Sequence, residues 1–173
     1  MSEWGRATFG QPCRACGFDW DLDLEQARAR VAEVPERYRA AIAGGDGSAQ
    51  HPDLTWTAGA YVCHVTDNLR IWAERLAAAS AGWTGQVSVY DPDVIAAGRV
   101  YEAVPIEGAL WSLGNSVGAW LEATAMAAAA GAGLSHPIRG PQSVLDVALN
   151  NTHDASHHAW DIRRSVEVAR EGS

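Results

Sequence analysis

Apolar residues recur at intervals of three and four positions in four separate stretches of this chain, and that spacing is typical of one buried face of an α-helix. The stretches run over residues 24–41, 55–80, 105–131 and 142–166. Between the second and the third, the pattern dissolves into Gly, Pro and Asp, with one short helix expected near residues 93–101. Four helices joined by one long crossover connection are typical of a bundle. We therefore expect an all-α four-helix bundle.

Helix boundaries follow from capping and helix-breaking residues. Pro35 interrupts the first stretch and predicts a kink or a break there. Thr55 or Thr57 can cap the second helix, and Pro105 is well placed to open the third. We assign no further regular element between the end of the third helix near residue 131 and the start of the fourth near Gln142.

Composition agrees with this assignment. The chain is 47% hydrophobic and 20% charged, and it combines Ala-rich stretches with only two Phe, which favours close-packed helices over a sheet. A length of 173 residues fits one hydrophobic core. We expect a single helical-bundle domain over residues 1–173, with a leader at residues 1–21.

Charge and hydropathy exclude several classes of partner. The formal net charge is -8 and no long Lys/Arg cluster occurs, so neither nucleic acid nor an anionic membrane surface is an expected partner. No apolar run reaches the roughly 18 to 20 residues that span a bilayer. The sequence predicts a cytoplasmic protein with a small-molecule substrate and, as one option, a second copy of the chain in a homodimer.

A histidine-rich segment in the last predicted helix carries the clearest chemical signal. Five ionisable side chains fall between residues 153 and 161. Two pairs four residues apart can bind a metal ion, either His153 with His157 or Asp154 with His158. His158 falls on the apolar stripe of the helix, whereas His153 and His157 continue a face that looks solvated. The pattern therefore favours Asp154 and His158.

His64 lies on the inward stripe of the second predicted helix and is the natural third ligand. Buried carboxylates and imidazoles are costly unless they are paired or coordinated, so three such groups call for a shared partner. The alternative is a set of hydrogen-bonded core histidines with Asp154 as their acceptor. We predict a divalent ion held by His64, Asp154 and His158, with zinc ahead of nickel or iron. Tyr61, three residues before His64, is a candidate catalytic donor, although a core tyrosine is the competing interpretation.

The cysteines leave several interpretations open. Cys13 and Cys16 form half of a zinc motif, and a lone Cys-x-x-Cys is weak support for a metal site. The pair can be ordinary reduced thiols, a reversible disulfide, or a metal clip that Cys63 or a histidine completes. Cys63 points about 100° away from its neighbour His64 on a helix, so we do not expect it to share the His64 metal.

The segments at residues 61–68 and 153–162 resemble the DinB-like family of four-helix metalloproteins, which includes the mycothiol-dependent maleylpyruvate isomerases and thiol S-transferases. The resemblance covers most of the chain, and it places the ligands at His64, Asp154 and His158. Asp154 departs from the commoner His or Glu at the middle position. The Cys13-x-x-Cys16 leader is similar to one on an actinobacterial-looking branch of that family.

The resemblance implies a metal-dependent enzyme, namely a transferase or isomerase that uses a low-molecular-weight thiol as cosubstrate and acts on a small electrophilic metabolite. Three protein ligands leave coordination positions open, and the site retains a charge of about +1 that attracts a thiolate. The same site can hydrolyse a substrate, and two histidines with a carboxylate also serve non-haem iron oxygenases. The competing class is a non-catalytic bundle that binds a small molecule or a protein chain, with a structural metal or none.

Overall fold

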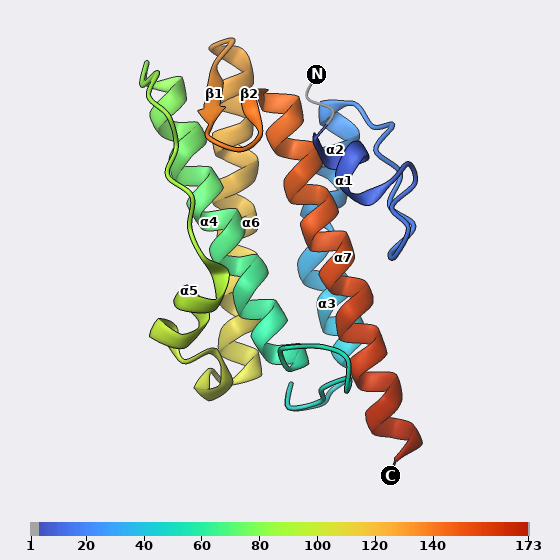
Figure 1. Cartoon of the computed structure of the whole chain (residues 1–173). Coiled ribbons are helices and arrows are strands. Elements are labelled where there is room, and N and C mark those ends of the chain that lie inside the picture. The colour runs from blue at the N-terminus through green and yellow to red at the C-terminus, as the bar shows by residue number, and fades with distance from the viewer. Residues whose placement is uncertain (1–3, 173) are drawn as a thin grey trace.

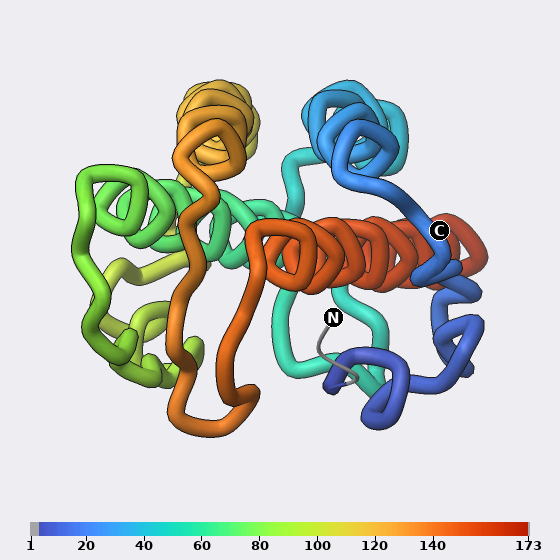
Figure 2. The backbone as a smooth tube through the Cα atoms, turned by 90° about the horizontal axis from the view of Figure 1, so that it is seen from above, coloured from blue at the N-terminus to red at the C-terminus, as the bar shows by residue number. Residues whose placement is uncertain are grey.

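The computed structural model describes residues 4–172 and has the expected four-helix bundle (Figure 1). The first bundle helix is divided into α2 (Leu24–Ala32) and α3 (Val34–Ile42), and the others are α4 (Ala58–Ser80), α6 (Ile106–Ala129) and α7 (Val144–Glu171). Seen from above, α6 lies beside α2 and α3 in one layer, while α4 and α7 form the other (Figure 2). The face of α4 and α7 that turns away from the first layer carries the remaining segments.

Local sequence signals set the helix ends. Thr57 caps α4 by accepting from the backbone N–H of Ala60, as one of the two predicted caps. Ser143 and Asp146 form a reciprocal capping box at the start of α7. Pro35 stands in the first turn of α3, and the helix is interrupted between α2 and α3 just before it. This interruption confirms the prediction.

The long connection after α4 contains α5 (Pro92–Arg99) and the 3₁₀-helix η1 (Tyr101–Ala103), close to the short helix expected there. It is fixed to the bundle through Asp67, which is 2% exposed. The Tyr101 hydroxyl donates to Asp67 Oδ2 at 2.6 Å, and the guanidinium of Arg99 also contacts this carboxylate. A buried charge is stable only when it is paired in this way, so Asp67 holds the crossover against α4.

Three elements are additional to the sequence prediction. Helix α1 (Trp4–Phe9) belongs to the predicted leader, and strands β1 (Gly133–His136) and β2 (Gly140–Ser143) form an antiparallel hairpin between α6 and α7. In Figure 1 the hairpin stands at the same end of the bundle as the start of α7. Among the described residues, no helix has the length and apolar character that crossing a membrane requires.

Helix α7 is anchored to the bundle core on several sides. The indole N–H of Trp120 on α6 donates to Asn151 Oδ1 at 2.9 Å, and the hydroxyl of Tyr38 on α3 donates to the carbonyl of Ala155 at 2.8 Å. Both aromatic side chains are fully buried. Buried polar groups that are satisfied in this way give a core one defined arrangement, so the rotation of α7 about its axis, and with it the direction of its histidines, is set by the core.

Candidate metal centre

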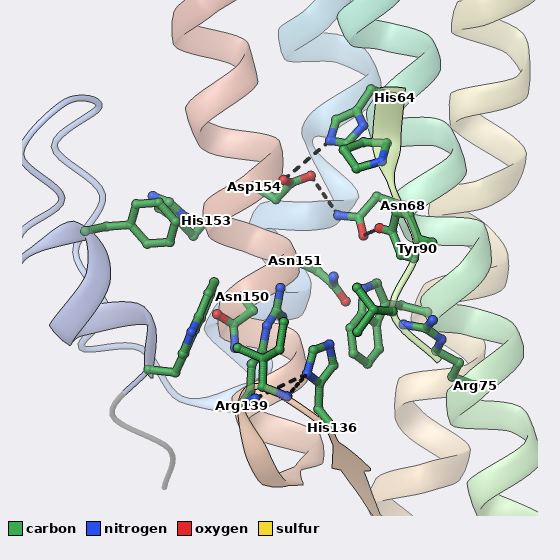
Figure 3. Close-up of a pocket in the computed structure, with 16 residues that line it drawn as sticks. His64, Asn68, Arg75, Tyr90, His136, Arg139, Asn150, Asn151, His153 and Asp154 are labelled. Carbon is green, nitrogen blue, oxygen red and sulfur yellow. Dashed lines mark hydrogen bonds and ion pairs between the residues drawn. The ribbon is translucent and has the colours of Figure 1, made fainter. Parts of the chain in front are cut away.

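The three predicted ligands lie together at the contact between α4 and α7. Asp154 Oδ1 is 3.6 Å from His64 Nε2 and 3.5 Å from His158 Nε2. All three residues offer donor atoms within 4.8 Å of one another. Figure 3 shows His64 approaching Asp154 from the neighbouring helix. The helical spacing and the bundle together produce the cluster that the sequence predicted.

These separations suit a shared ion better than direct hydrogen bonds. An N–H···O bond normally spans about 2.7 to 3.2 Å. Two ligand atoms that each lie about 2.1 Å from a tetrahedral ion are about 3.4 Å apart. The two separations from Asp154 Oδ1, 3.5 and 3.6 Å, match the second value. The residues present therefore fit a divalent metal ion.

A further carboxylate orients His158. Asp161, which is 2% exposed, places Oδ2 2.9 Å from His158 Nδ1. With the Nδ1 proton directed at Asp161, Nε2 is left as the unprotonated atom that faces Asp154 in the neutral ring. Carboxylates that hold the second nitrogen of a ligand histidine are common in metal sites. The sequence analysis gave Asp161 no role, although its position one helical turn after His158 was a usable signal.

Asp154 is oriented from the α4 side. Asn68 donates from Nδ2 to Asp154 Oδ2 at 2.7 Å, and its amide oxygen accepts from the Tyr90 hydroxyl at 2.7 Å. This chain of hydrogen bonds leaves Asp154 Oδ1 facing the imidazoles of His64 and His158, of which Figure 3 shows that of His64. Asn68 follows His64 by one turn of α4, which the sequence shows, whereas Tyr90 comes from the irregular crossover and carries no pattern that predicts its place.

The opposite charges of Asp154 and His158 stabilise each other within the cluster. Burial alone would raise the pKa of Asp154, but the imidazoles of His64 and His158 hold it well below its usual range. Burial alone would lower the pKa of His158, but Asp154 and Asp161 outweigh it and raise that pKa to about 9. In the metal-free protein, the two carboxylates therefore keep His158 protonated at neutral pH. The positive charge of the imidazolium takes the place of the charge that a metal ion would supply.

Tyr61, the predicted catalytic donor, lies beside the cluster. Its ring stacks on that of His158 with 4.8 Å between centroids. Burial raises the pKa of its hydroxyl, and backbone hydrogen bonds at Trp56 and Thr55 partly offset this effect. A cavity opens next to the cluster, and Tyr61 is not among the described residues that line it. Its packing supports the orientation of His158, and its catalytic role stays a prediction.

A cavity of about 310 Å³ opens beside the cluster, and His64 and Asp154 form part of its wall. Arg75 and Arg139 are also in this wall, one from α4 and the other from the turn between β1 and β2 (Figure 3). The Arg139 guanidinium lies 4.2 Å from the centre of the Trp4 ring, and that of Arg75 lies 4.6 Å from the centre of Trp72. In the described part of the chain, no carboxylate is within ion-pair distance of either arginine.

The face of α7 that was expected to be solvated is instead covered. His153 is 5% exposed, because Phe9, Phe18 and Trp20 of the N-terminal segment enclose its ring. This expectation was wrong because a segment distant in sequence packs on that face. Burial lowers the pKa of His153 to about 4, so its ring is neutral at pH 7.

His153 and His157 belong to a second group with Cys13 and Cys16, whose donor atoms also lie within 4.8 Å of one another. Burial would raise the pKa of Cys13, but backbone hydrogen bonds from Cys16 and Ala15 outweigh it and lower that pKa. Burial raises the pKa of Cys16 to about 11. Cys63 is in neither group, as its helical direction predicted.

The fold has a counterpart among solved structures. The chain is similar to YfiT from Bacillus subtilis, which is described as a probable metal-dependent hydrolase with an unusual four-helix bundle topology. The TM-score is 0.66 at 19% sequence identity, and the likeness covers 88% of this chain and 90% of YfiT. Neither a family model nor a curated protein matches the sequence. The likeness therefore shows the shared four-helix-bundle fold, which agrees with the fold expected from the DinB-like resemblance.

Proposed function

We propose that this chain is a metal-dependent enzyme in which His64, Asp154 and His158 hold one divalent ion and the adjoining cavity admits a small anionic substrate. The observation that carries the proposal is the convergence of three ligand atoms beside a cavity whose wall includes His64 and Asp154. Catalytic metal sites keep a coordination position open for water or substrate, whereas structural sites close all four. With one carboxylate and two neutral imidazoles, the site would retain about one positive charge.

An ion bound there would supply a Lewis acid and would lower the pKa of a coordinated water or thiol. The chain's own residues supply the geometry. Asp161 keeps the ring of His158 in one tautomer and one orientation, and Asn68 fixes the carboxylate of Asp154. Such supporting hydrogen bonds typically contribute about 10-fold to 100-fold to metal affinity or activity.

The arginines of the cavity define the class of substrate. Two guanidinium groups that have no carboxylate partner among residues 4–172 attract an anion. Arg139 can bind a carboxylate or phosphate in a bidentate manner, whereas Arg75 also donates from Nη2 to the Ser88 carbonyl. Stacking on Trp4 and Trp72 holds them in the cavity wall. His136, also in the wall, accepts backbone N–H groups at Nδ1, which places its proton on Nε2. We expect a small substrate that carries one or two acidic groups.

Two reaction classes fit this arrangement. The description of YfiT supports hydrolysis. Thiol transfer is supported by the resemblance to thiol-using DinB-like proteins and by one feature of the cavity: Asp154 is the one carboxylate in its described wall, and Asp154 is committed to the metal. A water nucleophile benefits from a separate general base. A thiol has an ordinary pKa of about 8.5, far below that of water, so it would ionise at the metal more readily and depend less on such a base.

The first experiment is metal analysis of purified protein and of single histidine variants. His64→Ala and His158→Ala should each lose one equivalent of divalent metal. His51→Ala is the matched control, because His51 lies outside both clusters and should keep the wild-type content. Unchanged metal content in His64→Ala and His158→Ala would contradict the proposal and would favour a non-catalytic bundle.

The reaction class is tested with cobalt in place of the native metal. Protein in which Cys13, Cys16 and Cys63 are all replaced by Ser removes the protein's own thiols from the spectrum. Titration of this cobalt protein with mycothiol, bacillithiol, glutathione or cysteine should produce a near-ultraviolet thiolate-to-cobalt band that saturates with one of them, if the enzyme transfers thiols. A spectrum that responds to small carboxylates or hydroxide, and to no thiol, would identify the hydrolytic class.

A further inference from the structure

The second cluster joins the N-terminal arm, residues 4–22, to the middle of α7. Cys13 and Cys16 come from the arm, and His153 and His157 are one turn apart on the helix. One donor atom from each of the four lies within 4.8 Å of the other three. Figure 1 shows the arm lying along α7 on the side away from α4. Two segments that are distant in sequence thus bring two sulfurs and two imidazoles together.

The imidazoles in this cluster have unused nitrogen atoms. His153 Nε2 and His157 Nδ1 are both buried and have no hydrogen-bond partner. His153 is 5% exposed, and the rings that enclose it offer no hydrogen-bond partner, since Phe9 and Phe18 have no polar side-chain atom and the Trp20 indole donates its N–H to the Gly10 carbonyl. Buried polar atoms are normally satisfied, and an unsatisfied one points to a missing partner. A metal ion would be that partner for both nitrogen atoms.

The local backbone holds the two cysteines in a closed loop. The N–H of Cys13 donates to the Phe18 carbonyl, and the N–H of Gly17 donates back to the Cys13 carbonyl, both at 2.9 Å. Gly17 has a φ of 73°, a left-handed conformation that side chains disfavour, although a Cβ there would meet nothing within 4 Å. The loop is therefore shaped by backbone conformation, and it presents both sulfurs to α7.

We propose that Cys13, Cys16, His153 and His157 bind a zinc ion as a closed, structural site. Four protein ligands fill a tetrahedral coordination sphere, and the Cys₂His₂ set is one of those used by structural zinc. Two thiolates and two neutral imidazoles offset both charges of the ion, so the site is neutral where it is buried. Thiolate ligands also favour zinc over magnesium, calcium or manganese.

This zinc site connects the arm to the cavity of the first metal centre. The ligands of the two sites interleave on α7, because His153 precedes Asp154 and His157 precedes His158. Trp4 and Phe9 of the same arm form part of the cavity wall. The zinc ion would hold that wall in place while taking no part in the chemistry. The inference rests on its own residues and stands independently of the proposed enzyme activity.

The test uses full-length protein that carries His64→Ala and His158→Ala, so that the first centre cannot bind metal. This protein should retain one zinc per chain. X-ray absorption should show two sulfur ligands at about 2.3 Å and two nitrogen ligands at about 2.0 to 2.1 Å. Its cobalt form should show a thiolate charge-transfer band and the intense visible bands of a tetrahedral ion. A zinc shell without sulfur would overturn the proposal.

Further variants in the same background identify the ligands. Cys13→Ser/Cys16→Ser should lose the ion and the charge-transfer band, and His153→Gln/His157→Gln should lose the ion while both thiols remain. Cys63→Ser is the matched cysteine control and should keep both signals. Circular dichroism confirms that each variant is folded, and the same cysteine pair replaced in otherwise wild-type protein should lower the metal content by one equivalent. Retention of the ion by Cys13→Ser/Cys16→Ser, or a Cys13–Cys16 disulfide in zinc-supplemented protein purified under reducing conditions, would contradict the proposal.

Discussion

His158 Nδ1 and Asp161 Oδ2 form a hydrogen bond of 2.9 Å across one turn of α7. This contact directs the other ring nitrogen, Nε2, toward Asp154 Oδ1, from which it lies 3.5 Å away. Asp161 is buried and therefore shielded from solvent. The arrangement resembles the carboxylate–histidine–metal relay, in which the outer carboxylate fixes the tautomer of the ligand.

The first prediction follows from this contact. Asp161→Asn keeps the shape of the side chain but removes the charge that holds the His158 ring, so metal affinity at the first centre should fall by about 10-fold to 100-fold. Competition with a calibrated chelator measures the change. Asp53→Asn, at a carboxylate whose side chain is 80% exposed, serves as the control. Equal affinities for wild-type protein and Asp161→Asn would show that Asp161 does not support the metal.

The second prediction concerns the metal-free protein. His158 has a folded-state pKa of about 9, whereas the unfolded chain has a pKa of about 6.5. A raised folded-state pKa stabilises the protein fully below about pH 6.5, and the stabilisation is lost as the pH rises through about 9. The free energy of unfolding should therefore fall over this interval.

His158→Gln isolates this contribution. Denaturant unfolding of metal-free wild-type and variant protein, at several pH values between 6 and 10, gives the difference between their unfolding free energies. That difference should shrink toward the alkaline end. A difference that stays constant across the interval would mean that His158 is not protonated in the metal-free fold.

The four helices and the convergence of His64, Asp154 and His158 could be predicted because each depends on periodicity within one segment. His64 and His158 fall on the inward stripes of their helices, and the bundle then brings those stripes together. Pro35 and Thr57 act through local backbone chemistry that sequence also reveals. The contacts of Tyr90 depend on how the irregular crossover folds back, and no periodic pattern encodes that.

The surroundings of His153 show where periodicity misleads. Helical spacing separates the faces of α7, but it does not say which segment covers each face. The arm supplies Phe9, Phe18 and Trp20 to bury His153, and those residues are more than a hundred positions away in the sequence. The hairpin of β1 and β2 was missed for a related reason, since four-residue strands rich in Gly and Pro give no clear alternation.

A third prediction concerns the anchor of the crossover. Tyr101→Phe removes the hydrogen bond to the buried carboxylate of Asp67, and hydrogen bonds to charged groups typically contribute about 1.5 to 3 kcal/mol. Thermal or denaturant unfolding should show a loss near the lower end, because Arg70 and Arg99 still pair with Asp67. Tyr38→Phe, which removes a bond to a neutral carbonyl, should cost less, at about 1 kcal/mol. If Tyr38→Phe lost more unfolding free energy than Tyr101→Phe, the hydroxyl of Tyr101 would not be the stronger of the two contributions to stability.

The last prediction tests whether the arginine-lined end of the cavity binds an anion. Arg139 is held between the rings of Trp4 and Trp72, and in the described part of the chain it has no carboxylate partner. A charge-assisted hydrogen bond from it to a substrate would contribute about 1.5 to 3 kcal/mol, which corresponds to roughly a tenfold or greater change in Kd.

Calorimetry with small mono- and dicarboxylates and with inorganic phosphate, on the metal-loaded protein, gives the affinities. Arg139→Gln should weaken the best of these ligands by about tenfold or more, while the metal content is unchanged because Arg139 contacts none of the metal ligands. Arg163→Gln is the matched control, since Arg163 is exposed on α7 outside the cavity. Anion binding that is equal in Arg139→Gln and wild-type protein would remove the basis for an anionic substrate, whereas a loss confined to Arg139→Gln would place the acidic group of the ligand beside the Trp4 and Trp72 rings.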